Sequence, residues 1–143
     1  MQQYDGRGSK VMVVDNDRTT LEMVQIRLDV AGFHPISARS AFGALDVLKT
    51  SRPDALILER NLPEMDGIQF LRELATIIPT SRMFPVLLVG RNLAADDVHA
   101  AVQLGVRDVL AKPFSGAAVI ERVTRLLKKT STPAAPAKTY VYV

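Results

Sequence analysis

Residues 11–17 read Val-Met-Val-Val-Asp-Asn-Asp, four apolar residues that run directly into three polar ones. A strand with one solvent-exposed face alternates apolar and polar residues, whereas a strand buried on both faces is continuously apolar. Apolar residues then recur at helical spacing up to Gly32, a natural helix end; the inward positions are Leu21, Val24, Leu28 and Ala31. The stretch therefore predicts a buried strand, a polar turn and a helix, which is one unit of a parallel sheet.

The same pattern recurs four more times along the chain. Apolar runs occupy residues 33–38, 55–58, 86–89 and 109–111, and each is followed by helical spacing of apolar residues. Strict alternation of strands and helices favours a parallel sheet with helices on both faces, and right-handed crossovers leave few topologies. The sequence therefore predicts an α/β fold with a doubly wound sheet, in which ligands bind at the carboxyl ends of the strands.

Local signals also predict where helices start and which side chains they bury. Thr19 and Glu22 have the spacing of a capping box, and Ser40 is a favourable N-cap. The core-facing positions expected in the three later helices are Ile68, Leu71, Ala75 and Ile78, then Val98, Ala101 and Val102, then Val119, Val123 and Leu127.

Composition sets the broad class of the protein. A chain of 143 residues with 48% hydrophobic and 23% charged residues is typical of one soluble domain. No apolar run approaches the roughly 18 residues that span a bilayer, and the polar start has no signal-peptide core. There is no cysteine, which excludes disulfides, thiolate metal sites and a Cys nucleophile. These features together favour the cytoplasm and argue against a membrane.

The distribution of basic residues bears on possible partners, and the composition of the chain ends bears on domain boundaries. The 18 basic residues are scattered and there is no Trp, so the chain lacks the basic block and stacking aromatics of a nucleic-acid platform. Residues 1–9 are expected to be an N-terminal tail, 10–129 the folded domain, and 130–143 a Pro/Ala-rich tail or linker. The terminal Tyr-Val-Tyr-Val of residues 140–143 alternates like a strand, and is either a peptide that docks by strand addition or a disordered end.

The residues just after each predicted strand should converge at one edge of a parallel sheet, and most of them are polar or charged. They are Asp15, Asn16 and Asp17 after the first strand, Glu59 and Asn61 after the third, Gly90 and Arg91 after the fourth, and Lys112 after the fifth. Acidic groups that face a lysine across a strand-end crevice suit a hard divalent cation and a phosphoryl group. The plainer interpretation is that such acidic residues cap the next helix, and for Asp17 alone capping is the better interpretation.

Three motifs make the family visible. Residues 13–17 (Val-Val-Asp-Asn-Asp), 58–67 (Leu-Glu-Arg-Asn-Leu-Pro-Glu-Met-Asp-Gly) and 110–114 (Leu-Ala-Lys-Pro-Phe) resemble the receiver domain of bacterial two-component response regulators, over residues 10–129. The resemblance implies a CheY-like, flavodoxin-like fold: five parallel strands in the order 2-1-3-4-5, flanked by five helices. It also implies Mg²⁺ held by two acidic residues and an aspartate that accepts phosphate from a histidine kinase, with a Thr or Ser, a lysine and a mobile aromatic completing the switch.

This sequence departs from that pattern at four positions. Asp15 keeps the first acidic position, but the second is Asn16, the phosphoacceptor position holds Glu59, the Thr/Ser position holds Gly90, and the switch aromatic is Val109. Lys112 is retained and Asn61 can still offer its carbonyl, so the degenerate metal set is Asp15, Asn16, Glu59 and Asn61.

Each departure has a physical consequence. Asn16 removes a negative charge, which weakens Mg²⁺ binding or abolishes it. Glu59 is one methylene longer than Asp, and a misplacement of about 1 Å can cost about a hundredfold in transfer; it could instead form a permanent ion pair with Lys112. A further hypothesis is that an arginine (Arg18, Arg60 or Arg91) replaces the metal in neutralising Asp15, Asp17 and Glu59, the alternative being that all three point into solvent.

The sequence therefore predicts an atypical pseudo-receiver that acts in signal transduction, without enzymatic activity or cofactor, as a phosphorylation-independent protein-interaction module. Its partner would be a kinase, an output protein or a second copy. The expected interaction face, by family habit, carries Asp97, His99, Gln103, Arg107, Glu121 and Arg125. Two alternatives stay open: a working Mg²⁺-dependent phosphoacceptor modified by a histidine kinase at Glu59, and a small-ligand-binding flavodoxin-like domain. Against the latter, residues 15–17 would repel phosphate.

Overall fold

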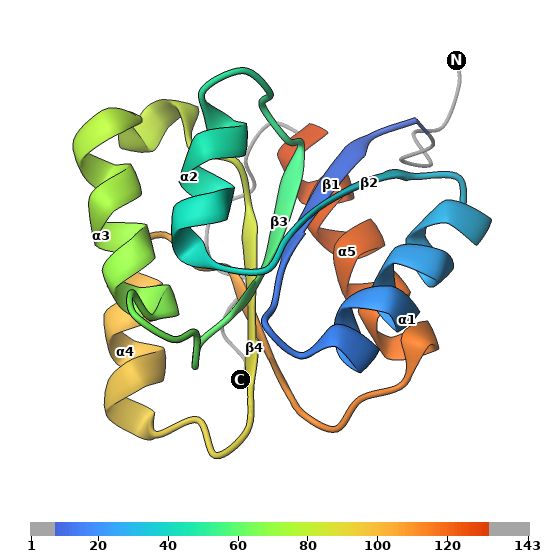
Figure 1. The fold of residues 1–143 in the computed structure, drawn as a ribbon. Helices are drawn as coiled ribbons and strands as arrows, with labels where there is room; N and C mark the ends of the chain where they lie inside the picture. The colour runs from blue at the N-terminus through green and yellow to red at the C-terminus, as the bar shows by residue number, and fades with distance from the viewer. Residues whose placement is uncertain (1–7, 132–143) are drawn as a thin grey trace.

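The computed structural model describes residues 8–131 and contains one five-stranded parallel sheet in the order β2-β1-β3-β4-β5 (Figure 1). The strands are β1 (Lys10–Val14), β2 (His34–Ala38), β3 (Ala55–Glu59), β4 (Val86–Gly90) and β5 (Asp108–Ala111). Every neighbouring pair is parallel. The predicted strand order and the doubly wound topology are therefore confirmed.

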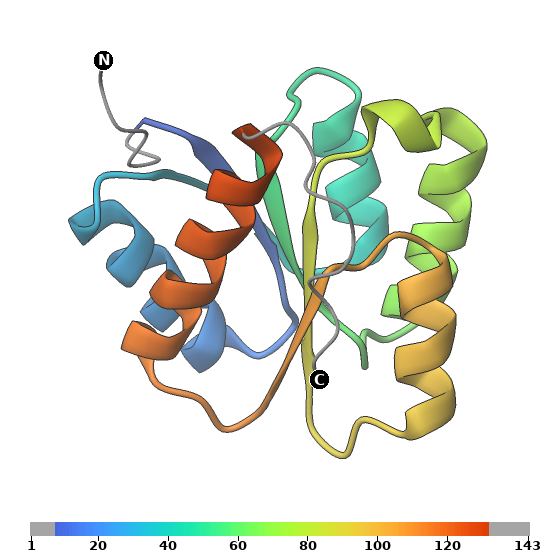
Figure 2. The same cartoon turned by 180° about the vertical axis from the view of Figure 1, so that it is seen from behind.

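Helices cover both faces of the sheet. The two helices α1 (Arg18–Val30) and α5 (Gly116–Ser131) cover one face, while α2 (Ala41–Leu48), α3 (Gly67–Ile77) and α4 (Ala95–Gln103) cover the other (Figures 1 and 2). A short 3-10 helix, η1 (Thr80–Arg82), precedes β4. No helix among residues 8–131 is both long and apolar enough to cross a membrane.

The strands are continuously apolar because each face of the sheet supports its own core. Met12, Val14, Leu56 and Leu58 pack with α2, α3 and α4, whereas the alternate strand residues, such as Val13, pack with α1 and α5. The edge strand β2 is only half-buried and contains Pro35, which a central strand would not tolerate.

The sequence offered two signals for the start of the first helix, and the structure follows one of them. The N-cap of α1 is Asp17, whose carboxylate accepts hydrogen bonds from the Thr19 N–H at 3.2 Å and from the Thr20 hydroxyl at 2.7 Å. The capping role preferred for Asp17 is therefore confirmed. The Thr19–Glu22 capping box is wrong, because Asp17 lies closer to the strand and already accepts a hydrogen bond from the first turn. Ser40 caps α2 as predicted.

The inward faces of two helices contain other residues than predicted. In α3 Phe70 and Leu74 are buried, while Ala75 is exposed because it lies about 100° around the helix from Leu74. In α4 the stripe that meets the core contains Ala100, Ala101 and Leu104, so Val102 falls outside it and is 56% exposed.

The end of the folded domain lies slightly beyond the predicted boundary at residue 129. Helix α5 extends through residues 130 and 131, which the sequence had assigned to the tail. Residues 1–7 and 132–143, and with them most of both predicted tails and the Tyr-Val-Tyr-Val segment, lie outside the described residues.

Candidate functional site

Three charged side chains meet at the carboxyl end of the sheet. The Lys112 ammonium lies 2.8 Å from Asp15 Oδ2 and 2.6 Å from Glu59 Oε1. The side chains of Lys112, Asp15 and Glu59 are only 7%, 2% and 4% exposed. The ion pair between Glu59 and Lys112 that the sequence suggested is therefore present, and Asp15 shares the same ammonium; we call these three residues the Lys112 clasp.

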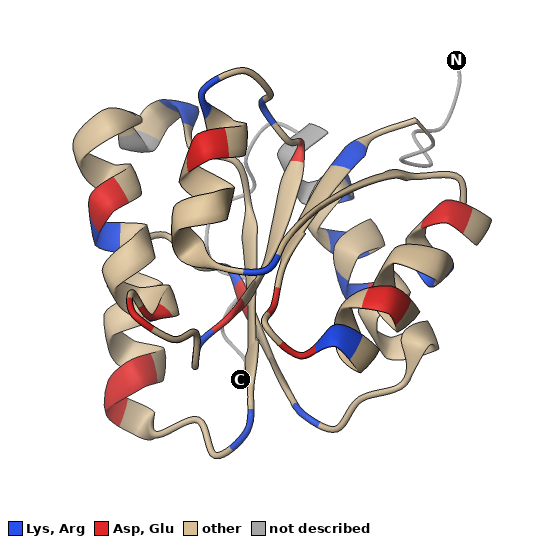
Figure 3. Ribbon diagram, in the orientation of Figure 1, with Lys and Arg blue, Asp and Glu red and all other residues tan. Residues whose placement is uncertain are grey.

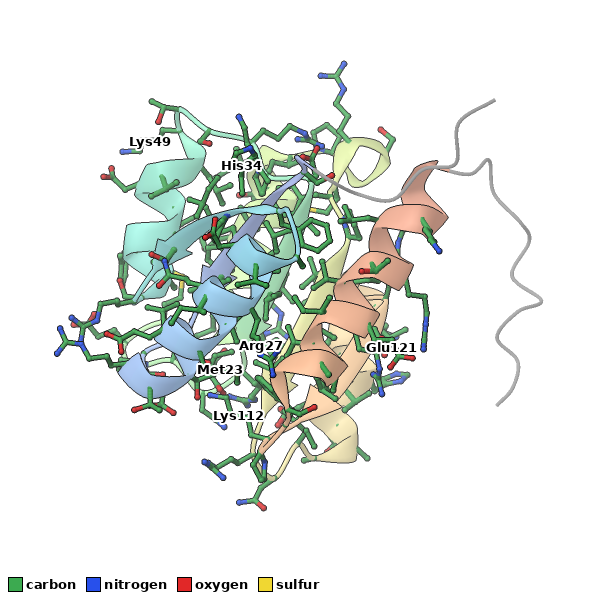
Figure 4. All side chains as sticks on the ribbon, turned by 90° about the vertical axis from the view of Figure 1, so that its right-hand side faces the viewer. Met23, Arg27, His34, Lys49, Lys112 and Glu121 are labelled. Carbon is green, nitrogen blue, oxygen red and sulfur yellow. The ribbon has the colours of Figure 1, made fainter. Side chains whose placement is uncertain are left out.

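Strand register brings the Lys112 clasp together. Val14 of β1 is level with Leu58 of β3, so Asp15 and Glu59 leave neighbouring strands side by side. Lys112 follows the end of β5 and reaches across β4 to both carboxylates. Figure 3 shows acidic residues around this end of the sheet, and Figure 4 shows Lys112 at the end opposite His34, which begins β2.

Backbone groups hold the remaining carboxylate oxygens. Asp15 Oδ1 accepts a hydrogen bond from the Asp17 N–H at 2.9 Å, and Glu59 Oε2 accepts one from the Asn61 N–H at 2.7 Å. Each carboxylate therefore has one oxygen bound by Lys112 and the other by the amide two residues further along the chain. The arrangement fixes both side chains, since a charge-assisted hydrogen bond is about twice as strong as a neutral one.

The Lys112 clasp carries two negative charges for one positive charge. Burial raises the pKa of Asp15 and the Glu59 charge adds to that effect, while the hydrogen bond from Lys112 only partly offsets them. For Lys112, burial alone would lower the pKa, but hydrogen bonds and charges from Asp15 and Glu59 outweigh it, so the pKa is raised. Lys112 is therefore charged at neutral pH, and its charge is divided between two carboxylates.

The predicted role of arginine in neutralising these carboxylates is wrong. Within residues 8–131, no arginine lies within ion-pair distance of Asp15, Asp17 or Glu59. Arg60 instead pairs with Asp97 of α4 at 2.9 Å and with Asp66, the N-cap of α3, at 3.4 Å. The guanidinium is thus engaged by carboxylates of α3 and α4 and acts on Glu59 only through a longer-range charge interaction, while Lys112 makes the direct contacts with the buried carboxylates.

The Arg60–Asp97 pair also changes the expected interaction face. The hydrogen bond from Arg60 lowers the pKa of Asp97. Asp97, predicted to be exposed, is half-buried by this pair, whereas the other predicted positions are exposed: His99, Gln103, Arg107, Glu121 and Arg125. Sequence reasoning missed the pair because its members are 37 residues apart and share no motif.

The remaining predicted site residues lie around the Lys112 clasp with separate roles. Asn16 and Asn61 are exposed, and Asn61 contributes its N–H to Glu59. Val109 is half-buried against the core on the α4 side, and its carbonyl accepts a hydrogen bond from Arg122 at 3.0 Å. In the described part of the chain, no three His, Cys, Asp or Glu residues are grouped so that they could hold a metal ion.

Comparison with known proteins decides the family. The sequence profile described as "Response regulator receiver domain" matches residues 11–124. The chain belongs to this family. The receiver domain is 33% identical over 130 residues to the probable transcriptional regulatory protein TcrX of Mycobacterium tuberculosis, a match covering 91% of this chain and 54% of TcrX. It is 31% identical over 125 residues to the Bacillus subtilis regulatory protein PhoP for alkaline phosphatase synthesis, covering 87% of this chain and 51% of PhoP.

The receiver domain spans about half the length of these curated relatives. Among solved structures, the receiver domain of the Francisella response regulator 1452 is similar with a TM-score of 0.77 and 26% identity, over 86% of this chain and 99% of that one. A putative response regulator from Chloroflexus aurantiacus matches with a TM-score of 0.76 and 30% identity, over 85% and 98%. The chain is thus a receiver domain of two-component signalling, as the three motifs predicted.

Proposed function

We propose that this receiver domain acts as a phosphorylation-independent protein-interaction module. The observation that carries the proposal is the engagement of Glu59: one carboxylate oxygen contacts Lys112 at 2.6 Å and the other accepts the Asn61 N–H at 2.7 Å. In-line transfer needs a carboxylate oxygen placed against the phosphorus. Neither oxygen of Glu59 is free, so the residue at the phosphoacceptor position works as the anchor of the Lys112 clasp.

The carboxylates available for Mg²⁺ binding also support the proposal. Mg²⁺ requires oxygen ligands in near-ideal octahedral geometry. The site offers two carboxylates, Asp15 and Glu59, both bound to Lys112, while the third nearby carboxylate, Asp17, caps α1. These residues do not fit Mg²⁺ well, and we propose that any binding is weak.

The residues that would relay phosphorylation are also replaced. Gly90 at the end of β4 has no hydroxyl, and Val109 in β5 has no ring that could change its position. We propose that α4, β5 and α5 instead present one fixed surface to a signalling partner, which is a kinase, an output protein or a second copy. The proposal assigns no enzymatic role to the domain; its cytoplasmic location and its lack of membrane and nucleic-acid partners stay predictions.

The test is a titration with Mg²⁺ and beryllofluoride, which together stand in for a phosphoryl group on a competent carboxylate. Amide NMR spectra of the wild type, Glu59→Asp and the matched control Glu73→Asp would be compared. Glu73 lies on the exposed side of α3, so its replacement leaves the site unchanged. We expect no saturable shifts at Asp15, Glu59 and Lys112 in the wild type or the control.

Other outcomes would support the alternative functions. Saturable shifts in the wild type that extend from Glu59 to α4 would make Glu59 a working phosphoacceptor and refute the proposal. Acid-labile and base-labile phosphate taken up from a small phosphodonor would refute it in the same way. Binding in Glu59→Asp alone would show that the added methylene is what blocks phosphoryl chemistry.

A further inference from the structure

Gly90 lies between β3, which carries Glu59 of the Lys112 clasp, and β5, which leads into Lys112. It ends β4, which pairs with β3 and Glu59 on one side and with β5 on the other. The Gly90 carbonyl accepts a hydrogen bond from the Lys112 N–H at 2.9 Å. The backbone of Gly90 is therefore held on the β5 side, while the residue before it, Val89, is paired with Glu59 of β3.

Backbone conformation does not explain a glycine here. The glycines of positive φ in the described chain are Gly8, Gly32 and Gly105, so Gly90 adopts a conformation open to any residue. Glycine weakens a strand because it loses more backbone entropy on folding and packs no side chain. The reason for the glycine must therefore be sought in the space around it.

That space is already filled by neighbouring side chains. A Cβ added at Gly90 would lie 3.1 Å from Glu59 Oε2, 2.9 Å from Leu93 Cδ2 and 3.3 Å from Arg60 Cβ. Each distance is shorter than an ordinary van der Waals contact. The Leu93 methyl belongs to a half-buried side chain and can rotate away, but Glu59 Oε2 is held by the Asn61 N–H and cannot shift without weakening that bond.

We propose that Gly90 is a positioning residue for the Lys112 clasp: its missing side chain leaves the room that the longer Glu59 needs to reach both Lys112 and Asn61. Glu59 and Gly90 then form one matched pair, and the two departures from the family pattern have a single physical cause. A side chain at position 90 displaces the Glu59 carboxylate, whereas a shorter acidic residue at position 59 leaves room for it. This inference deepens the proposed function. The role that it gives Gly90 in signalling rests on the proposed function, whereas the steric coupling between Gly90 and Glu59 does not.

A double-mutant cycle tests the pair. Wild type, Gly90→Ala, Glu59→Asp and the double variant are unfolded in urea and followed by far-UV circular dichroism. We expect Gly90→Ala to raise the unfolding equilibrium constant by about five- to a hundredfold, as overpacking does. In the Glu59→Asp background the factor by which Gly90→Ala raises the unfolding equilibrium constant should be at least fivefold smaller. The reason is that the effects of substitutions at contacting residues are coupled, whereas those at distant residues are additive.

Two controls separate the effect of Glu59 from that of Leu93 and from that of replacing a glycine elsewhere. A second cycle pairs Gly90→Ala with Leu93→Ala and measures the share of the strain that comes from Leu93. Gly43→Ala in α2, whose added Cβ would meet Ser40 and Ala38 and no side chain of the clasp, should show no coupling with Glu59→Asp. A readout specific to the clasp is the Lys112 ammonium resonance in ¹H–¹⁵N spectra: protected from water exchange in the wild type, it should exchange faster in Gly90→Ala.

Each outcome decides the inference. If Gly90→Ala is insoluble but Glu59→Asp restores a folded double variant, the rescue supports the pair; if neither folds, the inference is wrong. Equal cost in both backgrounds, full relief by Leu93→Ala, or an unchanged Lys112 resonance would also overturn it. Beryllofluoride binding by the wild type would refute the proposed function while leaving the coupling intact, so the two failures are distinguishable.

Discussion

Replacing Lys112 by Met should destabilise the domain more than any other single change at the site. The substitution keeps a long apolar side chain but removes the charge that lies 2.8 Å from Asp15 and 2.6 Å from Glu59. Both carboxylates then remain buried with only one backbone N–H each. Removing one partner of a buried ion pair costs about 3–5 kcal/mol, so we expect a loss of about 4 kcal/mol at pH 7, which is a large part of a typical domain's stability of about 5–15 kcal/mol.

The loss should depend on pH with a defined sign. The pKa of Asp15 is already raised above its ordinary value of 3.8 by burial, and removing Lys112 raises it further. A carboxyl group with a raised pKa is best tolerated in the folded state when protonated, so its effect on stability is most favourable at low pH and is lost as the pH rises through the folded-state pKa. The difference between wild type and Lys112→Met should therefore be smallest near about pH 4 and grow toward pH 7.

Urea unfolding followed by circular dichroism is the suitable assay, because the chain has no Trp. With a denaturant slope of about 1.5 kcal/mol per M, a loss of about 4 kcal/mol lowers the urea midpoint by about 2.7 M. The matched control is Lys49→Met, which removes an exposed pair with Asp46 at 3.5 Å and should cost less than about 1 kcal/mol. A loss below about 1 kcal/mol for Lys112→Met, or the same loss at pH 4 and pH 7, would refute the reasoning.

Three further predictions follow from single contacts. The raised pKa of Lys112 makes its stabilising effect complete below pH 10.5 and lost as the pH rises through the folded-state value, so wild type and Lys112→Met should converge in stability in strongly alkaline urea titrations. Asp66→Ala removes the N-cap and capping box of α3 and should cost about 1–2 kcal/mol in urea unfolding, against less than about 0.5 kcal/mol for the exposed Asp46→Ala. Gly67→Ala places a Cβ 2.6 Å from the Glu59 carbonyl oxygen, which is backbone and cannot move aside, so its thermal midpoint should fall by an amount equivalent to about 1–3 kcal/mol. An unchanged midpoint in Asp66→Ala or Gly67→Ala would show that α3 starts elsewhere in solution.

The charged groups of the clasp were predictable because a parallel sheet gathers its strand ends. Once the apolar runs placed Asp15, Glu59 and Lys112 directly after buried strands, their convergence followed from topology. The contact between Glu59 and Lys112 followed from side-chain length and opposite charge. The backbone amides of Asp17 and Asn61, which complete the binding of both carboxylates, carry no sequence signal because every residue except proline has such a group.

The errors have a different origin. The capping box at Thr19 failed because an equally good cap, Asp17, came first in the chain. Arg60 failed as a partner of Glu59 because the direction of a side chain at the end of a strand depends on the following loop, which placed it against Asp97. Val102 was misassigned because sequence periodicity gives the apolar stripe of a helix but not its rotation against the sheet.

The sequence by itself determined the alternating strands and helices, the family and the chemical groups at the sheet edge, since periodicity and motifs depend only on residues close together in the chain. The strand order followed from the family resemblance. Only the tertiary structure decided how those groups are bound. In the folded chain both buried carboxylates lie within 3 Å of one ammonium. The side chains packed around Gly90 leave too little space for a Cβ at that position. These contacts depend on the relative placement of three strands, and the strength of a charge or the cost of a methyl group depends on what surrounds it.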